Sequence, residues 1–427
     1  MKHKFNKKLL IVFKLIVILI VITFVWFHLR ITSQDFNQES DQSFNDKTRV
    51  KVTISTNKLS HLSNTLSLKQ LKTQIEDINR KQEVFNYHIF GPLLSHHLVI
   101  VIQVHNRTQY LLSLIESLKQ TKHINNVLLI FSHDVFNEEI NSLISSINFC
   151  KVIQVFYPKS LQLHPNSFPG QSDNDCPRDV SYEDAVKIGC INRLSADTFG
   201  HYREAKYSQT KHHFWWKINI IFDLLNITRH HLGNFMFLEE DHYLAPDALH
   251  VWKLMNEYRN KNCPQCQVIT LGSYTHSYNY KQNGYKISIS KWISSQHNMA
   301  FIINRNVWNL IKMCAKTFCT YDDYNWDWSL QYVSEKCLKS PLKTLYVLIP
   351  RVYHTGECGL HHNKQNCNNK QVIQKIKQLL KTNGNYLFPK QMVLYEKSQF
   401  YPKIKVNGGW ADPRDHQLCL NHTFYSQ

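Results

Sequence analysis

The sequence predicts an α/β protein built on a mainly parallel sheet and preceded by one membrane-spanning helix. Short apolar runs alternate with helical patterns after residue 97, and several of these runs end abruptly in polar residues. Alternating strands and helices favour a parallel sheet with crossover helices. A separate apolar run near the N-terminus has about the 20 residues that a helix needs to cross a bilayer.

The N-terminal apolar run occupies residues 9–29 and is interrupted only by Lys14 and His28. Four lysines come before it: Lys2, Lys4, Lys7 and Lys8. The positive-inside rule therefore predicts that residues 1–8 are a cytosolic tail and that the chain after the span is lumenal. A cleaved signal peptide is the alternative, but the run is longer than a typical signal core and no small-residue cleavage site closes it. We expect an uncleaved signal anchor.

Residues 30–87 are rich in Ser, Thr, Asn, Gln, Lys and Asp, with little apolar periodicity apart from a helical pattern near residues 66–78. This composition is typical of a stem. Residues 88–427 are dense in Trp, Tyr and Phe and contain no internal repeat, so we expect them to form the lumenal domain.

Four runs in that domain predict buried strands: residues 97–105, 127–134, 152–157 and 235–241. Residues 108–122 have apolar side chains at helical spacing, which suits a crossover helix between the first two strands. Ligands of such sheets bind at the carboxyl ends of the strands. Function is therefore expected where strands run into VHNR, FSHD and LEEDH.

The net charge of +18 suits anionic partners such as a nucleotide diphosphate or phospholipid headgroups. We find no nucleic-acid-binding motif, and a lumenal domain would not meet nucleic acid. P-loop, GxGxxG, GxSxG and HExxH patterns are also absent from the sequence. Kinase, nicotinamide-dependent, serine hydrolase and zinc protease functions thus lack their usual support.

All 11 cysteines follow residue 149, in a segment that the anchor would place in an oxidising compartment. Disulfides are therefore expected, with one cysteine left over. The CxxC pair Cys263 and Cys266 has a zinc knuckle or a redox pair as alternatives, and the histidines between Cys358 and Cys367 allow a zinc site. Spacing alone leaves the connectivity open.

Two strand ends carry residues suited to a metal. Glu239, Glu240 and Asp241 end an apolar run, and a divalent cation with a bound diphosphate would relieve the repulsion among their charges. A solvated acidic turn is the alternative. His354 follows another apolar run and suits Mn²⁺ alongside oxygen ligands, although a single histidine in such a place is more often an ordinary one.

Two aromatic clusters are further candidates. Residues 321–328, YDDYNWDW, place three acids among four rings, as carbohydrate binding and proton transfer require; a helix that buries its rings in the core is an equal alternative. Residues 201–217 combine cationic and aromatic side chains. They suit a wall of donors against diphosphate oxygens, and a surface amphipathic helix is the alternative.

Several segments together resemble the N-acetylglucosaminyltransferase II family across residues 90 to 420. They are IQVHNR, VLLIFSHD, CPRD, GCIN, FGHYREAKYSQTKHHFWWK, FLEEDHYLAPD, FCTYDDYNWDWSLQY and NGGWADPRDHQLC, and they are long, rare and in order. The resemblance implies a GT-A glycosyltransferase fold with a Rossmann-like N-terminal half, in a type II protein of the Golgi membrane. It also implies inverting transfer of N-acetylglucosamine from UDP-N-acetylglucosamine to the 2-hydroxyl of the α-1,6-arm mannose of N-glycans, which commits them to complex-type biantennary structures.

The resemblance also assigns roles to matched positions. It implies Mn²⁺ bound by Asp241 and His354, Asp327 as the catalytic base, and Asp134 as the carboxylate that reads uracil. The implied nucleotide-sugar residues are Gln103, Val104, His105, Asn106, Arg107, Asp134, His201, Gln209, Thr210, Lys211, His212 and His213. The chain departs from the family at Tyr278, where we align a substrate-contacting arginine.

The disulfides implied by the resemblance are Cys176–Cys190, Cys263–Cys266, Cys314–Cys337, Cys319–Cys419 and Cys358–Cys367, which leaves Cys150 free. Glycosylation sequons stand at Asn106, Asn226 and Asn421, and a homodimer is left open. Two alternatives remain: another β-1,2-N-acetylglucosaminyltransferase, or a membrane-anchored glycan-binding protein without catalysis. The YDDYNWDW run argues against the first, and the intact predicted metal and base residues argue against the second.

Overall fold

The computed structural model describes residues 67–274, 278–356, 369–396, 404 and 406–423. The predicted tail, the membrane span at residues 9–29 and the stem up to residue 66 lie outside the described residues. Within the described ranges, no helix is long and apolar enough to cross a bilayer. Thr65–Gln427 form one compact unit.

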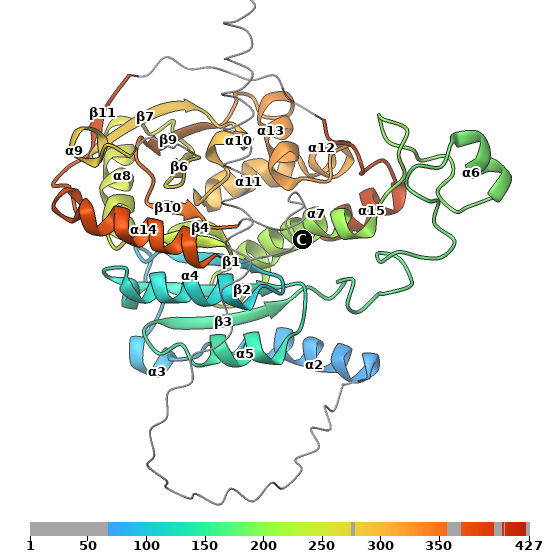
Figure 1. Ribbon diagram of the computed structural model, residues 1–427, viewed down its shortest axis with the longest axis horizontal. Helices are drawn as coiled ribbons and strands as arrows, with labels where there is room; N and C mark the ends of the chain where they lie inside the picture. Colours follow the sequence, from blue (N-terminus) through green and yellow to red (C-terminus); the bar gives the residue numbers. More distant parts are fainter. Residues whose placement is uncertain (1–66, 275–277, 357–368, 397–403, 405, 424–427) are drawn as a thin grey trace, which may run out of the picture. The chain divides into compact units, whose positions relative to one another are not determined.

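A nine-stranded mixed sheet runs through this unit in the order β11-β7-β9-β6-β8-β4-β1-β2-β3 (Figure 1). Its strands are β1 (Val99–Val104), β2 (Leu128–His133), β3 (Lys151–Phe156), β4 (Asn234–Glu239), β6 (Val268–Thr270), β7 (Lys286–Lys291), β8 (Phe301–Asn304), β9 (Lys343–Val347) and β11 (Val393–Leu394). Strands β1 to β4 pair in parallel, as the Rossmann-like prediction requires. The other half is mixed, because β8 is antiparallel to β4 and β6, and β7 is antiparallel to β9.

Helices join and cover the strands. They are α2 (Leu68–Lys81), α3 (Tyr87–Phe90), α4 (Thr108–Gln120), α5 (Glu138–Ser145), α6 (Tyr182–Ile188), α7 (Ala205–Asn219), α8 (Ala248–Asn262), α9 (Tyr280–Asn283), α10 (Ser294–His297), α11 (Arg305–Met313), α12 (Ala315–Thr320), α13 (Trp326–Lys336), α14 (Lys370–Thr382) and α15 (Pro413–Asn421). A small antiparallel pair, β5 (His242–Leu244) with β10 (Val352–His354), stands beside the main sheet. The predicted crossover helix is α4.

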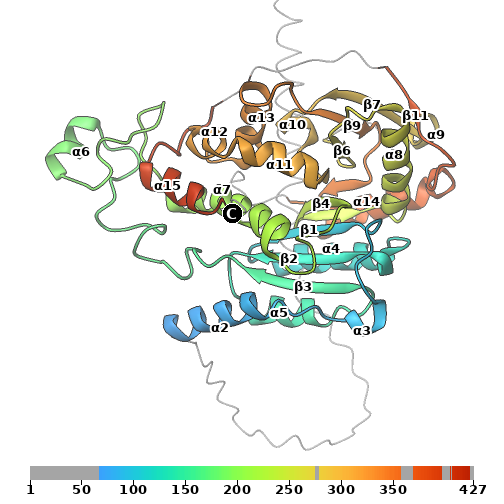
Figure 2. The same cartoon turned by 180° about the vertical axis from the view of Figure 1, so that it is seen from behind.

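The predicted strands are nearly continuous apolar runs because both faces of the sheet are buried. Along β1, Ile100 and Ile102 pack with residues of α4 and α8, whereas Val99 and Val101 pack with residues of α7, α11 and α13. The sheet lies between α4 on one side and α7 on the other, as Figures 1 and 2 show from opposite directions. This sandwich fixes α7 across the sheet, where it borders the candidate site.

Part of the predicted stem belongs to the folded unit. Helix α2 places Leu71 and Ile75 against Phe156 of the edge strand β3. The Nδ2 atom of Asn79 also donates to the Phe156 carbonyl at 2.6 Å, and the Phe156 N–H donates back to Asn79 Oδ1 at 2.8 Å. Residues 67–87 therefore cover an edge of the sheet. The predicted boundary at residue 88 is too late, because two apolar residues four positions apart suffice to dock a helix.

Four of the implied disulfides are present: Cys176–Cys190, Cys263–Cys266, Cys314–Cys337 and Cys319–Cys419. The Cys263–Cys266 bond argues against the zinc-knuckle alternative for that pair, because disulfide-bonded sulfurs are not thiolate ligands. Cys150 is free, as the resemblance implied. It is also buried, and burial raises the pKa of its thiol to about 12. Cys358 and Cys367 lie outside the described residues.

Candidate active site

The polar residues that follow β1 and β4 meet at one edge of the sheet. Gln103 of β1 is level with Glu239 of β4, and the Glu240 N–H donates to the Gln103 carbonyl at 3.0 Å. After the turn at Asp241 the chain forms β5, and β10 pairs with β5 so that His354 stands opposite His242. This pairing brings His354 Nε2 to 3.5 Å from Asp241 Oδ2, although more than one hundred residues separate them in sequence. The two predicted metal ligands are thus neighbours.

Arg107 offsets the charge of the acidic run. Its guanidinium donates to Glu240 Oε1 at 2.6 Å and to Asp241 Oδ2 at 2.9 Å. Burial raises the pKa of Asp241, but Arg107 and His354 outweigh burial, so that its pKa is lowered and the carboxylate is ionised. The pKa of Glu240 is raised by burial, which Arg107 offsets only in part. One arginine therefore faces three acids, and the cluster retains negative charge.

The surroundings of Asp241 and His354 fit a divalent metal. Asp241 is 4% exposed, and its Oδ1 atom has no hydrogen-bond partner in the structure. A Cβ atom at Gly356 would lie 2.4 Å from Asp241 Oδ2 and 3.0 Å from His354 Cε1, so glycine leaves space beside the pair. Carboxylate and imidazole ligands suit Mn²⁺. Among the described residues there is no group of three or more His, Cys, Asp or Glu side chains arranged for a metal, so these two supply only part of a coordination shell.

Asp134, the predicted uracil-reading carboxylate, follows β2 and is held from two sides. His105 Nδ1 lies 2.7 Å from Asp134 Oδ1, and Gln209 Nε2 donates to Oδ2 at 3.1 Å. His213 Nδ1 stands 3.7 Å from the same oxygen. Burial raises the pKa of Asp134, but the interactions with His105 and His213 outweigh it and hold the pKa well below its usual range. The structure thus brings three of the other predicted nucleotide-sugar residues around the ionised carboxylate of Asp134.

Helix α7 presents a polar stripe to the strand ends. Gln209, His213 and Lys217 recur every fourth residue and so share one helix face. The stripe reaches Asp134 through Gln209, Ser132 of β2 through His213 Nε2 at 2.8 Å, and Gln103 of β1 through Lys217 Nζ at 2.7 Å. Lys217 was not among the predicted site residues. The sequence feature that could have identified it is its position four residues after His213, on the same helix face.

Lys211 and His212 were predicted to contact the nucleotide sugar, but their side chains are buried among protein groups. The Lys211 ammonium donates to the carbonyls of Tyr321 and Asp323 at 3.0 and 2.9 Å. Burial lowers its pKa to about 7. His212 Nε2 lies 2.8 Å from Asp415 Oδ1. Both therefore fasten other segments to α7, because neighbours of the stripe on a helix point in other directions.

The other predicted nucleotide-sugar residues differ in exposure. Val104 is buried in the sheet core, Thr210 is half-buried on α7, and Asn106 is exposed, where its Oδ1 accepts from Asn137 Nδ2 at 2.7 Å. His201 Nδ1 pairs with Asp179 at 3.1 Å, and its N–H donates to Asp197 at 2.8 Å. These contacts join His201 to the segment around α6, and its contact with the nucleotide stays a prediction.

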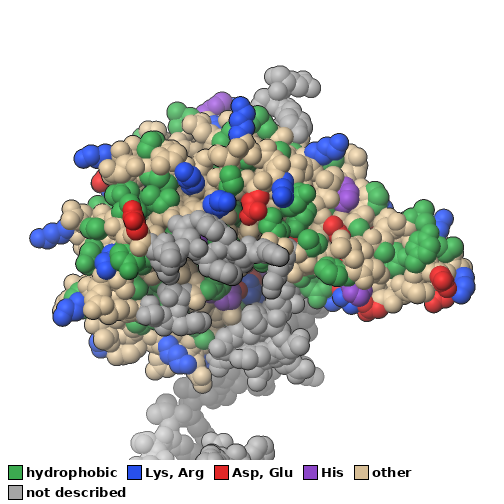
Figure 3. Space-filling model, turned by 90° about the horizontal axis from the view of Figure 1, so that it is seen from above, with side chains coloured by type: hydrophobic (Ala, Val, Ile, Leu, Met, Phe, Trp, Pro, Cys, Tyr) green, Lys and Arg blue, Asp and Glu red, His purple; other side chains and the backbone are tan. Residues whose placement is uncertain are grey.

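The segment around α6 also exposes large apolar side chains. Five of them are between 53% and 73% exposed: Tyr182, Ile188, Ile191, Leu194 and Phe199. Figure 3 shows hydrophobic side chains gathered on this side of the molecule, at the right of the view. Exposed apolar surface of this kind is typical of contact surfaces.

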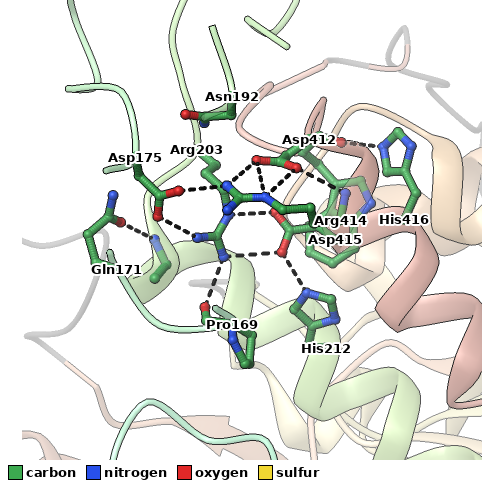
Figure 4. Close-up of polar contacts among 12 residues, drawn as sticks. Pro169, Gln171, Asp175, Asn192, Arg203, His212, Asp412, Arg414, Asp415 and His416 are labelled. Atoms are coloured by element: carbon green, nitrogen blue, oxygen red, sulfur yellow. Dashed lines mark hydrogen bonds and ion pairs between the residues drawn. The ribbon is translucent and has the colours of Figure 1, made fainter. Parts of the chain in front are cut away.

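A buried ion network, which the sequence did not predict, ties the C-terminal helix to α7 (Figure 4). Arg203 Nε donates to Asp415 Oδ2 at 2.7 Å, and the same carboxylate meets His212. Arg414 donates to Asp175 at 2.7 Å. Burial raises the pKa of Asp415, but His212 and Arg203 outweigh it and lower the pKa to about 2. The network and the Cys319–Cys419 bond together fix α15.

The aromatic and acidic run at residues 321–328 contributes in part to the core. The Trp326 ring stacks on Phe214 of α7 with centroids 4.1 Å apart, so this ring fills the core. Asp323 is fully buried and accepts from the backbone and side-chain amides of Asn325 and Asn407. It is therefore committed to holding the loop. The carboxylate of Asp327, one residue after Trp326, bonds a different part of the chain.

Asp327 lies in the first turn of α13 with a fixed carboxylate. Its Oδ2 atom accepts from Ser294 Oγ at 2.7 Å and from Asn298 Nδ2 at 2.9 Å, and its Oδ1 accepts from the Trp328 N–H at 3.0 Å. Exclusion of water raises the pKa of Asp327, and these bonds offset the effect only in part. The sequence did not single out Ser294 and Asn298, because they are brought to Asp327 by α10 from thirty residues away.

Tyr274 connects the two halves of the site. Its ring lies 6.3 Å from the His354 ring, and its side chain is 46% exposed. Burial raises the pKa of its hydroxyl, and the charges of Glu239, Asp327 and Asp241 raise it further. Because one hydroxyl is affected by all three carboxylates, Asp327 lies in the same part of the molecule as the Asp241–His354 pair. Neighbouring Tyr278 packs against Tyr353.

Comparisons with known proteins bear on this arrangement. The model of the N-acetylglucosaminyltransferase II family matches residues 72–419. The α-1,6-mannosyl-glycoprotein 2-β-N-acetylglucosaminyltransferase of Homo sapiens is 46% identical over 353 residues, which cover 82% of this chain and 79% of the human protein. The enzyme of that name from Sus scrofa is 44% identical with the same coverage, and the one from Arabidopsis thaliana is 34% identical over 79% of this chain and 77% of its own.

Among solved structures, S. aureus TarS 1–349 in complex with UDP-GlcNAc overlaps with a TM-score of 0.32 and 9% identity, covering 66% of this chain and 65% of that one. A TM-score this low does not establish a shared fold. The assignment to a family therefore rests on the family model and the sequence relatives.

Proposed function

Because the chain belongs to the N-acetylglucosaminyltransferase II family, we propose that it transfers N-acetylglucosamine from UDP-N-acetylglucosamine to the 2-hydroxyl of the α-1,6-arm mannose of N-glycans, on a GT-A fold. The relatives named for this activity match most of the chain. The observation that carries the proposal is the fixed carboxylate of Asp327, which lies in the same part of the molecule as Asp241 and His354.

Asp327 would act as the general base. Ser294 and Asn298 fix the carboxylate, and its raised pKa makes it a stronger proton acceptor than an exposed aspartate. As the mannose 2-oxygen forms its bond to C1 of the donor sugar, the bond from C1 to the diphosphate oxygen breaks and the hydroxyl proton passes to Asp327. UDP leaves from the opposite face, so the anomeric configuration inverts without a covalent enzyme intermediate.

Asp241 and His354 would hold Mn²⁺. The metal, when bound, would supply positive charge against the departing diphosphate. Arg107 contributes positive charge at the same place and holds the Asp241 carboxylate in position. The acidic run keeps excess negative charge that a divalent cation would offset.

Asp134 would accept a hydrogen bond from uracil. Its low pKa keeps it ionised at the pH of any cellular compartment, and Gln209 and His105 hold its two oxygens in place. A fixed acceptor recognises a base better than a mobile one, because less side-chain entropy is lost on binding.

We further propose that the protein is a type II protein of the Golgi membrane, anchored by residues 9–29. The proposal is supported by the apolar run, by the lysines that precede it and by four disulfides, which are typical of proteins folded in an oxidising compartment.

The full chain in detergent, with UDP-N-acetylglucosamine, Mn²⁺ and a biantennary N-glycan that already carries N-acetylglucosamine on its α-1,3 arm, tests the function by mass spectrometry. We expect one added N-acetylglucosamine, lost with EDTA and lost when the α-1,3 arm is bare mannose. Transfer onto that bare mannose would instead indicate a transferase I activity. Glycan binding without transfer would indicate a non-catalytic protein.

A further inference from the structure

Lys217 is a buried cation bonded to an uncharged partner. It lies near the C-terminal end of α7 and is 2% exposed. Its ammonium donates to Gln103 Oε1 at 2.7 Å and lies 5.2 Å from the centroid of the Phe214 ring. The partner that it contacts is an amide and not a carboxylate, whereas buried lysines are usually paired with an acid.

This placement is costly for stability. Burial lowers the pKa of Lys217 to about 7, and the charges of Glu239 and Asp134 oppose that shift without contact at salt-bridge distance. An apolar side chain would fill the space between Phe214 and the sheet at less cost. The ammonium therefore calls for an explanation beyond packing.

The explanation lies in the direction of the Gln103 amide. Lys217 Nζ donates to Gln103 Oε1, so the oxygen of the Gln103 amide points toward α7. The NH₂ group projects from the same carbon in another direction, so the contact with Lys217 does not occupy it. Gln103 is half-buried at the end of β1, level with Glu239, so its amide lies at the edge of the sheet where the candidate site lies.

The other members of the α7 stripe support this interpretation. Gln209 holds Asp134 and His213 holds Ser132, eight and four residues before Lys217 on the same helix face. Each stripe residue thus bonds a group at the end of β1 or β2. Lys217 donates to the side chain of Gln103 at the end of β1, just as Gln209 donates to the side chain of Asp134 after β2.

We propose that Lys217 is a positioning residue for the donor, and that it holds the Gln103 amide so that its NH₂ group donates to an oxygen of UDP-N-acetylglucosamine at the end of β1. The inference rests on the proposed function and names a residue that acts through another. The donor diphosphate and ribose supply acceptor oxygens for such a bond.

A double-mutant cycle on the full chain in detergent tests the inference. Lys217→Met removes the ammonium at similar length, and Gln103→Leu removes the amide. Each variant should raise the KM for UDP-N-acetylglucosamine and weaken UDP binding in calorimetry about tenfold, the loss expected for one hydrogen bond. The KM for the acceptor glycan should stay unchanged. The double variant should be no worse than the weaker-binding single variant, because both changes remove one interaction.

Lys119→Met is the matched control, since Lys119 is an exposed lysine on α4 and should leave both KM values unchanged. Additive losses, or an equal rise in the KM values for donor and acceptor, would overturn the inference. Transfer by the unaltered chain is measured in the same assay, so a failure of the proposed function is recognised separately.

Gln103→Glu provides a second variant in case Lys217→Met does not fold. Glutamate retains an oxygen toward the ammonium, so the fold and the thermal midpoint should be preserved, but it has no NH₂ group to present. UDP binding should weaken at least tenfold. Binding as tight as that of the unaltered chain would show that the NH₂ group of Gln103 has no role.

Discussion

The Asp327→Asn variant should remove the proposed general base and keep most of the hydrogen bonds that hold this side chain. The asparagine oxygen can replace Oδ2 and accept from Ser294 and Asn298, so two of the three hydrogen bonds survive. The third is lost, because the new NH₂ would face the Trp328 N–H. Loss of one such bond costs about 1 kcal/mol, and removal of a charge from a water-poor position offsets part of it.

The expected effect on turnover is larger. A general base contributes roughly 10² to 10⁴ in rate, which corresponds to about 3 to 5 kcal/mol of activation free energy. We therefore expect kcat to fall at least about a hundredfold, while the free energy of unfolding changes by about 1 kcal/mol or less. UDP affinity should not change, because Asp327 is not among the groups around Asp134. Initial rates, urea unfolding and UDP calorimetry measure the three quantities.

The pH dependence provides a second test of the same residue. Burial raises the pKa of Asp327, and a base must be deprotonated to act, so kcat should rise with pH through a value above the usual range for aspartate. Ser294→Ala removes a bond to the carboxylate, so the pKa should rise further and the acid limb should move to higher pH. Rates from about pH 4 to 8 would show this shift.

Asp322→Asn is the matched control within the same run. Asp322 accepts from the N–H groups of Thr198 and Trp410, so its loss should affect stability more than kcat. Turnover of Asp327→Asn within about tenfold of the unaltered chain would refute the assignment of the base. A parallel loss of UDP binding would indicate that Asp327 supports the fold.

Three further predictions follow from the metal pair, the disulfides and the ion network. Gly356→Ala should weaken Mn²⁺ binding at least about tenfold, because the new methyl group would meet Asp241. The transfer rate, measured as a function of Mn²⁺ concentration, reports this loss. A rate that depends on Mn²⁺ as in the unaltered chain would contradict the metal site. Cys319→Ser should lower the free energy of unfolding by about 2 to 5 kcal/mol, because its disulfide closes a loop of 100 residues; chemical denaturation that shows no loss would contradict a stabilising role. The pKa of Asp415 is depressed to about 2, so its ionisation contributes stability above its unfolded value of 3.8 that is lost as pH falls toward 2. Asp415→Asn should remove roughly 2 kcal/mol of that pH-dependent stability, and unfolding curves with the same acid slope as the unaltered chain would exclude this role.

The sequence predicted strands β1 to β4, which are buried on both faces, and missed strands that lack a continuous apolar run. Strands β1 to β4 are six-residue apolar runs, and each was predicted. Strand β7 mixes buried and less buried residues and β11 has two exposed ones, so neither has a continuous apolar run to recognise. The mixed half of the sheet depends on pairings between distant segments, which periodicity within one segment does not reveal.

For the site, the limit was the direction of side chains on α7. Twelve of its 15 residues are buried, so it has no polar face by which the sequence could orient it. The cationic cluster at residues 209–213 was therefore predicted to contact the nucleotide sugar as a whole. In the structure Gln209 and His213 reach the strand ends, whereas Lys211 and His212 face the loop at 321–323 and Asp415.

Helix α7 is one rigid element that contacts both halves of the candidate site. Its stripe holds Asp134 and Gln103 at the donor end, and its Phe214 stacks on Trp326, the residue before Asp327. A base must meet the reacting hydroxyl within hydrogen-bond reach, so its position relative to the donor has to be fixed within fractions of an ångström. A single buried helix that contacts both sides provides that constraint. Its burial, which hid the orientation of its side chains from sequence analysis, is also what makes it rigid.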